Sequence, residues 1–432
     1  MQVTIENIYQ HYLDHPLIST DSRHIQPGSL FFALKGDSFD GNDFANTALQ
    51  LGASYAIVDN PKLAADNRFL LVENVLTTLQ QLARYHRNTK DIPVIAITGT
   101  NGKTTTKELV CEVLSKKYRT LATRGNLNNH IGVPLTLLRL RSDTQIAVVE
   151  MGANHPGEID FLCHIARPGY GIITNIGKAH LEGFGGFEGV INAKTELYRY
   201  LKGNGQKVFV HSDDPLLMNH SSDMDRITYG TGPSFLTAKT ISARPFIAIE
   251  LVAHNQMPLA IQSQLYGKYN LPNMLAAACI GTFFDVNPEL IKEALEHYLP
   301  DNNRSQIKQT TNNTLILDAY NANPASMAAA LSTFAETSWP NKVVLLGEML
   351  ELGEASDEEH LRILDLLDQY RFQQVFLVGK TFARLNTRRE NICFHDSDLA
   401  RLWLEHHRLK NTTILIKGSR GIKLEKVVEA LS

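Results

Sequence analysis

Hydrophobic and polar positions follow two alternating periods along almost the whole chain. Short apolar runs rich in Val, Ile and Leu are separated by longer segments with the 3.6-residue spacing of amphipathic helices. Examples of the apolar runs are LFFAL, VIAIT, IAVVEM, GIITNI, TLILDAY and TTILIKG. This order predicts an α/β fold with a mostly parallel sheet and crossover helices. Residues 237–265 instead carry short alternating runs, which predict an antiparallel excursion from that sheet.

The same alternation divides the 432 residues into three predicted domains. The first, 1–91, is a small α/β domain followed by the linker-like sequence DIP. The second, 92–302, is the largest, and we expect a central domain with a mostly parallel sheet. The third, 303–432, begins a new strand–helix alternation and is expected to be a Rossmann-like α/β domain.

Composition and charge exclude several classes of partner. The net charge of −3 provides no electrostatic attraction for nucleic acid or for an anionic membrane. No apolar run approaches the roughly 20 residues of a membrane span, and the start MQVTIENIYQHYLDH does not resemble a signal peptide. The four cysteines lie far apart and have no metal-binding spacing. We therefore expect a reduced, cytoplasmic protein without nucleic-acid or membrane partners.

A glycine-containing sequence after the run VIAIT is typical of a phosphate-binding loop at the start of a helix. Its backbone N–H groups suit phosphate oxygens, Lys103 adds a positive charge, and the Thr104 hydroxyl is a suitable Mg²⁺ ligand. Ile97 stands where the longer P-loop consensus has its first glycine, so this is the shorter G-x-x-G-K-T form. The predicted loop residues are Gly99, Thr100, Asn101, Gly102, Lys103, Thr104 and Thr105.

Two further side chains are candidates for the same site. The run IAVVEM brings Glu150 to the carboxyl end of a predicted strand, where open α/β sheets bind ligands, although a surface glutamate in a turn fits the same sequence. His180 follows the predicted strand GIITNI. Most isolated histidines are surface or core residues, but beside Thr104 and Glu150 it becomes a candidate metal ligand. No N-K-x-D motif of a GTPase is found.

A longer series of motifs gives the chain a resemblance to the Mur ligase family, the ATP-dependent amide-forming enzymes of peptidoglycan synthesis. The motifs, in family order, are GTNGKTTT, VVEMGANH, NIGKAHLEGFG, AKTELY, YNLPN, NR, LDAYNANP, LLGEMLELG and IKGSR. Within the family, TDSR, FFALKGDSFDGNDF, TRGNLNNHIGVPLTLLRL and DAYNANP are similar to the members that add D-alanyl-D-alanine to UDP-N-acetylmuramoyl-tripeptide. The resemblance covers nearly the whole chain and implies these substrates, ATP and a monomeric enzyme.

The resemblance also implies catalytic and metal-binding roles. Lys103 would bind phosphate, and Thr104 with Glu150 would bind a first Mg²⁺. His180 would bind a second Mg²⁺, together with a carbamylated Lys194 whose anionic oxygens suit a hard cation. By sequence alone, Lys194 would be an exposed helix lysine. The implied catalytic residues are Lys103, Glu150, His180 and Lys194.

Substrate-binding roles follow from the same resemblance. Further nucleotide contacts are implied for Asn270, Asn273, Arg304 and Asp318. The uridine nucleotide would be bound by Ser22, Arg23 and Lys35 of the first domain. The muramoyl-peptide would pass Asn126, Asn128 and Asn129. The incoming dipeptide would meet Tyr320, Asn321, Asn323 and Ser419 of the third domain.

Four motifs depart from the family pattern. Tyr269 stands where the family usually has histidine, and Asn302 and Asn303 stand where Pro-Gly usually precedes Arg304. Ala319 replaces a frequent serine, and the usual D-G-H-D reads D-G-N-D at 40–43. All four concern the periphery of nucleotide or substrate binding and leave the phosphate and metal groups intact.

Three alternative functions remain at this point. The chain could be a related ligase for a different amino acid, a folylpolyglutamate synthetase, or a non-catalytic module that switches with ATP. The TDSR and FALKG sequences argue against the folate enzyme. The presence of Glu150, His180 and Lys194 together argues against a non-catalytic module. The sequence leaves open the third residue of the tripeptide and the base that deprotonates the amine.

Overall fold

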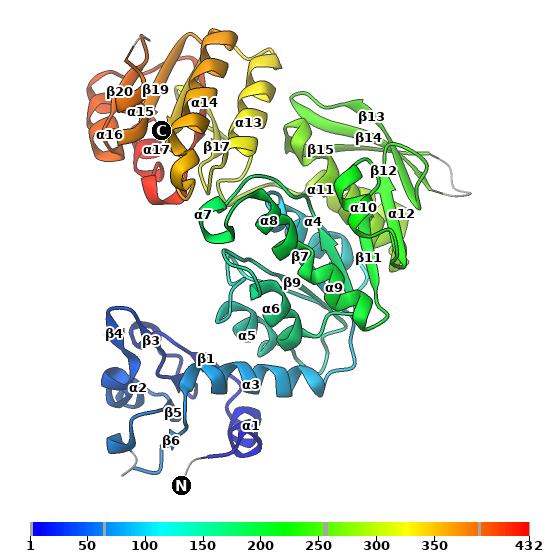
Figure 1. Cartoon of the computed structure of the whole chain (residues 1–432), viewed down its shortest axis with the longest axis vertical. Coiled ribbons are helices and arrows are strands. Elements are labelled where there is room, and N and C mark those ends of the chain that lie inside the picture. The colour runs from blue at the N-terminus through cyan, green and yellow to red at the C-terminus, as the bar shows by residue number, and fades with distance from the viewer. Residues whose placement is uncertain (1–2, 64–65, 254–257, 388–389, 432) are drawn as a thin grey trace.

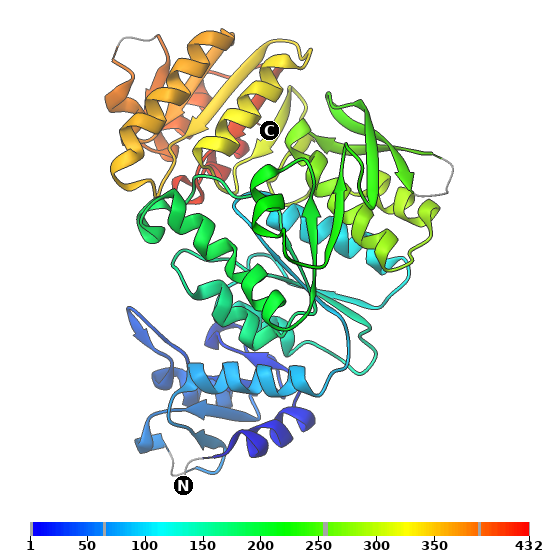
Figure 2. The ribbon, with the colours of Figure 1, turned by 45° about the vertical axis from the view of Figure 1, so that its right-hand side comes forward.

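Each β-sheet of the chain takes its strands from one continuous part of the sequence (Figure 1). The structure, a computed structural model, describes residues 3–63, 66–253, 258–387 and 390–431. The N-terminal and C-terminal parts lie at opposite ends of the long axis, with the largest sheet between them (Figures 1 and 2). The α/β class and the mostly parallel sheets predicted from the sequence are confirmed.

The N-terminal part is a small parallel sheet with helices around it. Its strands, in spatial order, are β1 (Ile18–Ser19), β2 (Leu30–Phe32), β5 (Tyr55–Val58) and β6 (Phe69–Leu71). A separate hairpin consists of β3 (Lys35–Gly36) and β4 (Phe39–Asp40). The helices are α1 (Ile5–Asp14), α2 (Ala45–Gln50) and α3 (Val75–Asn88). The side chain of Asn74 accepts a hydrogen bond from the Thr77 N–H at 2.8 Å, so α3 begins with a capped first turn.

The central sheet has nine strands. In spatial order they are β15 (Leu259–Tyr266), β14 (Phe246–Ala253), β13 (Leu236–Ser242), β12 (Arg226–Gly230), β11 (Lys207–His211), β10 (Tyr170–Ile173), β7 (Val94–Thr98), β9 (Ile146–Glu150) and β8 (Thr120–Ala122). The strands from β8 to β13 are parallel, whereas β14 pairs antiparallel with both β13 and β15. The predicted antiparallel excursion at 237–265 is therefore confirmed.

Helices connect and cover the central strands (Figure 2). They are α4 (Lys103–Ser115), α5 (Gly132–Leu137), α6 (Glu158–Ala166), α7 (Leu181–Phe184), α8 (Phe187–Lys194), α9 (Glu196–Gly203), α10 (Pro215–His220), α11 (Leu271–Phe283) and α12 (Pro288–His297). The chain leaves β7 for β8 and β9 on one side and then returns to β10 on the other side. This reversal places the carboxyl end of β7 at the switch point of the sheet, where open α/β folds bind ligands.

The C-terminal part has its own six-stranded sheet. In spatial order the strands are β16 (Gln306–Gln309), β17 (Asn313–Asp318), β21 (Thr412–Lys417), β18 (Lys342–Gly347), β19 (Gln374–Val378) and β20 (Ile392–Phe394). Only the edge pair β16–β17 is antiparallel. The helices are α13 (Pro324–Glu336), α14 (Ser356–Tyr370), α15 (Lys380–Leu385), α16 (Ser397–His406) and α17 (Glu425–Ala430).

One expected strand end, and the position of a residue that follows it, need correction. The run GIITNI leaves the sheet after Ile173, because Thr174 and Asn175 turn towards the phosphate loop, where the Asn175 carbonyl accepts a hydrogen bond from the Thr100 N–H at 2.9 Å. His180 consequently lies at the start of α7, at the end of a loop, and not just past a strand end as expected. By contrast, β9 ends at Glu150 as predicted.

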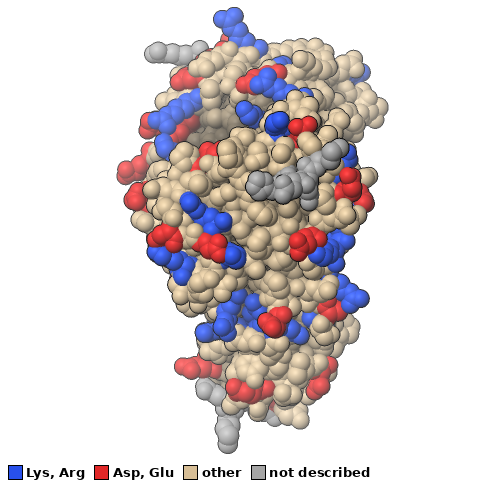
Figure 3. Space-filling model, turned by 90° about the vertical axis from the view of Figure 1, so that its right-hand side faces the viewer, with Lys and Arg blue, Asp and Glu red and all other residues tan. Residues whose placement is uncertain are grey.

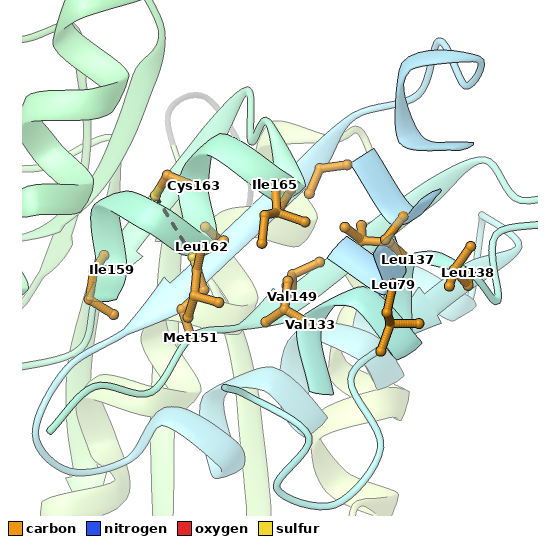
Figure 4. Close-up of a cluster of buried hydrophobic side chains, with 14 of the residues drawn as sticks. Leu79, Val133, Leu137, Leu138, Val149, Met151, Ile159, Leu162, Cys163 and Ile165 are labelled. Atoms are coloured by element: carbon orange, nitrogen blue, oxygen red, sulfur yellow. Dashed lines mark hydrogen bonds between the residues drawn. The ribbon is translucent and has the colours of Figure 1, made fainter. Parts of the chain in front are cut away.

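A continuous apolar cluster joins the N-terminal and central parts (Figure 4). Leu79 of α3 is fully buried and lies beside side chains of α5, α6 and β9. Among these are Val133, Leu137, Val149 and Leu162, each at most 1% exposed. Because burying one such side chain stabilises a fold by about 1.5–3 kcal/mol, this cluster anchors α3 firmly to the central part.

The outer surface has no dominant sign of charge on the face in Figure 3, where acidic and basic side chains are interspersed. Within the described ranges, none of the helices is both long and apolar enough to cross a membrane.

Candidate functional site

One polar cleft of about 810 Å³ lies between the central sheet and the C-terminal part. It is lined by most of the residues predicted for the site, although they come from distant parts of the sequence. Those that line it are Thr100, Asn101, Gly102, Lys103, Thr104, Thr105, Asn126, Asn128, Asn129, Glu150, His180, Asn270, Asn273, Arg304, Asp318, Tyr320, Asn321, Asn323 and Ser419. The structure therefore brings together the predicted phosphate, metal and dipeptide groups.

The phosphate loop connects β7 to α4, and the structure explains why two of its positions are glycine. Gly99 has φ +141°, and a Cβ there would lie 2.1 Å from the Thr174 hydroxyl. Gly102 has φ +80°, and a Cβ there would lie 2.5 Å from the side-chain oxygen of Asn273. A larger residue would clash at both positions and would also be strained. Asn273 and Asn270 thus pack directly on the loop, where Asn273 Nδ2 donates to Asn270 Oδ1 at 2.9 Å.

Lys103 closes the loop from the first position of α4. Its Nζ donates to the carbonyl oxygens of Gly99 at 2.8 Å and Thr100 at 3.0 Å. Burial lowers the pKa of Lys103 to about 8, the nearby Arg304 lowers it too, and the Glu150 carboxylate opposes the shift. Anionic phosphate oxygens would restore the charge of this amine.

Thr104 and Glu150 have buried oxygen atoms without protein partners. Thr104 is 3% exposed and Glu150 is 1% exposed. One carboxylate oxygen of Glu150 accepts a hydrogen bond from Asn128 Nδ2 at 2.8 Å. Glu150 Oε2 and the Thr104 hydroxyl have no hydrogen-bond partner among the residues described. Such orphaned oxygens cost free energy unless a ligand satisfies them, and a hard cation such as Mg²⁺ prefers these ligand types.

Lys194 is buried, so the exposed helix position predicted from the sequence alone is wrong. It is 3% exposed at the end of α8, and its Nζ donates to the Ala153 carbonyl at 3.4 Å and lies 5.3 Å from the centre of the Phe184 ring. Ala153 lines the cleft. Burial lowers the pKa of Lys194 to about 7, and the positive charge of Lys103 acts in the same direction. A large share of this amine is therefore neutral near pH 7.

His180 contacts the C-terminal part across the cleft. Its Nδ1 lies 2.6 Å from a carboxylate oxygen of Glu351. Burial lowers the pKa of His180, and the carboxylate of Glu351 opposes this shift. Nearby, Lys178 pairs with Glu359 of α14 at 3.2 Å, and α7 packs against the short 3₁₀ helix Gly353–Ala355.

Arg304 and Tyr320 form a stacked pair in the cleft. The guanidinium carbon lies 3.8 Å from the centre of the Tyr320 ring, and Arg420 approaches the same ring at 5.1 Å. Arg304 Nε is buried and has no partner among the described residues. Stacking fixes the plane of the guanidinium and leaves its donors available to an anionic ligand.

Two departures from the family pattern have structural explanations. Asn303 has φ +57°, the left-handed region that glycine favours and that asparagine tolerates better than most residues. The Tyr269 hydroxyl lies 2.8 Å from the hydroxyl of Ser305, which has φ +53°. Asn303 can therefore adopt the backbone conformation that glycine favours. Tyr269 supplies a polar contact to Ser305 in the segment that connects the central sheet to the C-terminal sheet.

Asp318, predicted as a nucleotide contact, and Asn323, predicted as a dipeptide contact, also have structural partners. Asp318 accepts hydrogen bonds from the Ser305 N–H at 3.2 Å and from Lys417 Nζ at 2.6 Å. Asn323 caps α13, accepting from the Ser326 N–H at 2.9 Å, and its Nδ2 donates to Asn101 Oδ1 of the phosphate loop at 2.7 Å. Asn323 therefore joins the C-terminal part to the loop besides facing the cleft.

The residues predicted for the uridine nucleotide lie apart from this cleft, on the N-terminal part. Asp21 caps the short 3₁₀ helix Ser22–His24, and its carboxylate accepts from Arg23 Nη2 at 2.7 Å. Hydrogen bonds from Arg23 hold the pKa of Asp21 well below its usual range. Lys35 pairs with Asp59 at 3.0 Å.

Sequence reasoning missed several residues of the cleft. Glu158, Asn175 and Glu351 all line it but were not predicted as site residues. Asn175 Oδ1 accepts from the Asn101 N–H at 3.0 Å, which fixes the phosphate loop. A polar residue next to the end of a central strand was the available signal for Asn175. Glu351 lies in a loop, and its position depends on how the C-terminal part packs.

The fold and this site define a P-loop nucleotide-binding α/β protein whose cleft is shared with a second α/β sheet. Three family models match the chain: "Mur ligase family, catalytic domain" at residues 16–87, "Mur ligase middle domain" at 97–281 and "Mur ligase, glutamate ligase domain" at 303–420. The chain belongs to the Mur ligase family.

Similar proteins match over almost the whole length. The UDP-N-acetylmuramoyl-tripeptide–D-alanyl-D-alanine ligase of Bacillus subtilis is 35% identical over 430 residues, covering 96% of this chain and 92% of that protein. A crystal structure of MurF from Acinetobacter baumannii is 34% identical, with a TM-score of 0.85 and coverage of 96% and 92%. The MurF ligase of Thermotoga maritima in complex with ADP is 27% identical, with a TM-score of 0.84 and coverage of 97% of each chain.

Proposed function

We propose that this enzyme joins D-alanyl-D-alanine to UDP-N-acetylmuramoyl-tripeptide with hydrolysis of ATP to ADP and phosphate, a step of peptidoglycan precursor synthesis. The observation that carries the proposal is the pair of unsatisfied buried oxygens of Thr104 and Glu150 beside Lys103, in a cleft closed on its other side by Arg304. Full-length similarity to ligases of this name supports the choice of substrates.

ATP would lie in the cleft with its phosphates on the loop. The N–H groups at the start of α4 and Lys103 would bind phosphate oxygens. Arg304, Asp318, Asn270 and Asn273 would contact the rest of the nucleotide. A first Mg²⁺ fits the Thr104 hydroxyl and Glu150 Oε2, which have no hydrogen-bond partner among the described residues. When bound, the cation would neutralise charge on the phosphate oxygens.

A second Mg²⁺, bound by His180 and a carbamylated Lys194, belongs to the same proposal. The neutral Lys194 amine would add to CO₂ to form an N–C bond and release one proton to solvent. Its burial and its lowered pKa of about 7 favour this reaction, because only the neutral amine is a nucleophile. In the unmodified protein, the positive charge of Lys103 disfavours a second positive charge on Lys194. The carbamate would replace that charge by a negative one near Lys103.

The chemistry proceeds in two displacements. The terminal carboxylate oxygen of the tripeptide attacks the γ-phosphorus, the bond to the bridging oxygen breaks, and ADP leaves. The neutral amine of D-alanyl-D-alanine then attacks the acyl phosphate carbonyl, phosphate leaves, and the nitrogen loses a proton. Lys103 and Arg304 would stabilise negative charge on the transferred group, and closure of the cleft would exclude water that would hydrolyse the acyl phosphate.

The remaining substrate contacts divide between the ends of the molecule. Ser22, Arg23 and Lys35 would bind the uridine nucleotide, and Asn126, Asn128 and Asn129 would line the path of the muramoyl-peptide. Tyr320, Asn321, Asn323 and Ser419 would receive the dipeptide.

We place the domain boundaries at 91/92 and 302/303. We also propose a monomer in the cytoplasm, where ATP and the uridine nucleotide are supplied.

The test is phosphate release with purified protein, ATP, Mg²⁺ and each acceptor combination. Release should require both UDP-N-acetylmuramoyl-tripeptide and D-alanyl-D-alanine, and mass spectrometry should find the pentapeptide product. Release with a folate and glutamate, or with a single amino acid in place of the dipeptide, would support a rival ligase. ATP binding without any release would support a non-catalytic module.

A further inference from the structure

A polar cluster behind the phosphate loop ties α4 to the connection that carries Arg304. Glu108 lies one turn after Thr104 on the same face of α4. Its carboxylate accepts hydrogen bonds from Asn302 Nδ2 at 2.9 and 2.8 Å, one to each oxygen, and from the Tyr298 hydroxyl at 2.6 Å. Lys107 Nζ lies 3.4 Å from the same carboxylate. Hydrogen bonds to a charged acceptor are about twice as strong as neutral ones.

The far side of the same connection is also held. The backbone N–H of Ser305 donates to Asp318 Oδ1 at 3.2 Å, and its hydroxyl lies 2.8 Å from the Tyr269 hydroxyl and 3.1 Å from Asn270 Nδ2. Asn303 and Ser305 both have left-handed backbone conformations, with φ +57° and +53°. A chain that turns twice in this way has little freedom once both of its ends are fixed.

Arg304 is the residue between these two attachments. Its guanidinium lies on the Tyr320 ring at 3.8 Å, and its charge reaches Lys103 of the phosphate loop. No described residue accepts a hydrogen bond from its buried Nε. The side chain is therefore oriented but left without an acidic partner, as a group that awaits an anion would be.

We propose that Glu108 is a positioning residue of the nucleotide site, which acts through Asn302 to hold Arg304 in register with the phosphate loop. The inference rests on the proposed function, because it takes Arg304 as a nucleotide contact. Since Glu108 and Thr104 share one face of a rigid helix, any shift of Glu108 against Asn302 changes the distance between Arg304 and the loop. Glu108 itself touches no substrate in this arrangement.

Three variants and one control test the inference by the dissociation constant of ADP, measured by calorimetry on the full chain. N302D places a carboxylate against Glu108 and should weaken ADP binding about tenfold or more. E108Q keeps the shape but removes the negative charge that the Asn302, Tyr298 and Lys107 donors face, and should weaken ADP binding about threefold. In the double variant E108Q/N302D the glutamine at 108 can donate a hydrogen bond to the carboxylate at 302, the reverse of the wild-type contact. Its affinity for ADP should recover to within about threefold of the wild type. E112Q, the same change one turn further along α4 at an exposed position, should leave it unchanged.

If Glu108 and Asn302 only supported folding, their variants would also change the Michaelis constant for the uridine substrate. The Michaelis constant for the uridine substrate should stay within about twofold of the wild type in all four variants, because that ligand is bound at the other end of the molecule. The inference is overturned if N302D and E108Q bind ADP as tightly as the wild type, or if the double variant is no better than N302D. Wild-type protein that binds no ADP would instead overturn the proposed function.

Discussion

The side-chain amide of Asn128 donates to one oxygen of the Glu150 carboxylate at 2.8 Å, and the other oxygen is buried without a hydrogen-bond partner in the part of the chain that the structure describes. Glu150 ends β9, and Asn128 lies in the loop before α5, so the contact orients a carboxylate towards the start of α4. We expected Asn128 to line the muramoyl-peptide path, and this contact adds a second role.

Asn128→Ala should therefore raise the Mg²⁺ concentration needed for half-maximal activity by about tenfold. Removing the donor of a buried hydrogen bond costs roughly 1–3 kcal/mol, and here it would leave the Glu150 carboxylate less well oriented for the cation. Asn126→Ala in the same loop is the matched control. It should leave the Mg²⁺ dependence unchanged while raising the Michaelis constant of the uridine substrate. Equal Mg²⁺ titrations for Asn128→Ala and wild type would remove Asn128 from the metal site.

Thr104→Val should separate stability from activity. The hydroxyl is buried without a hydrogen-bond partner in the described ranges, so its replacement by a methyl group of similar shape should raise the free energy of unfolding by roughly 1 kcal/mol in nucleotide-free protein. Phosphate release should fall at least about 100-fold, because the hydroxyl is a proposed Mg²⁺ ligand. Thr104→Ser keeps the hydroxyl and should retain most activity. Denaturant unfolding and phosphate release measure the two effects, and a destabilised Thr104→Val would show that the hydroxyl already has a partner.

Lys103→Ala should abolish ligation while the protein stays folded. The Nζ bonds only the carbonyls of Gly99 and Thr100 among the hydrogen bonds that the structure describes, so its loss frees the loop without opening an apolar core. Far-ultraviolet circular dichroism should match the wild type, and phosphate release should be undetectable. Lys117→Ala, two residues after the end of α4, serves as an exposed lysine control. Near-normal turnover of Lys103→Ala would refute the phosphate assignment.

Lys194 should impose a pH dependence on both stability and modification. Its pKa is lowered by burial to about 7 from the ordinary 10.5, so between these values the unfolded chain binds more protons than the folded chain. The contribution of Lys194 to the free energy of unfolding should therefore rise with pH from 7 to 10.5 in CO₂-free buffer, and Lys194→Met should lack this rise. Added bicarbonate should activate the wild type less as the pH falls below 7, where the amine is protonated. Labelled CO₂ that is trapped on the wild type but not on Lys194→Met would identify the carbamate, whereas equal labelling would exclude it.

Asn321 and Asn323 should differ in their effects. Asn321 is exposed, and its Oδ1 accepts a hydrogen bond from the adjacent Ala322 N–H at 2.9 Å. Asn321→Ala should raise the Michaelis constant for D-alanyl-D-alanine about tenfold, and that for ATP little. Asn323→Ala also removes a helix cap and the contact to Asn101, so it should lower the free energy of unfolding by about 1 kcal/mol and weaken ATP binding as well. Asn323→Asp keeps the cap and should restore stability. A main effect on the uridine substrate in either variant would move the dipeptide pocket elsewhere.

The sequence by itself determined the features that depend on neighbouring residues. The phosphate loop is one continuous segment, and the run VIAIT matches β7 residue for residue, because a parallel strand that is buried on both faces is nearly continuously apolar. Glu150 at a strand end follows from the same reasoning. The antiparallel excursion was also predictable, since its alternation has the period of a half-buried strand.

Only the tertiary structure decided which of these groups lack partners and which are held. The burial of Lys194, the orphaned oxygens of Thr104 and Glu150, and the stacking of Arg304 on Tyr320 all depend on side chains from other elements. The contact between Glu108 and Asn302 joins residues 194 positions apart. No local period encodes such a pair, because desolvation and hydrogen bonding across a cleft are set by how whole sheets and helices pack.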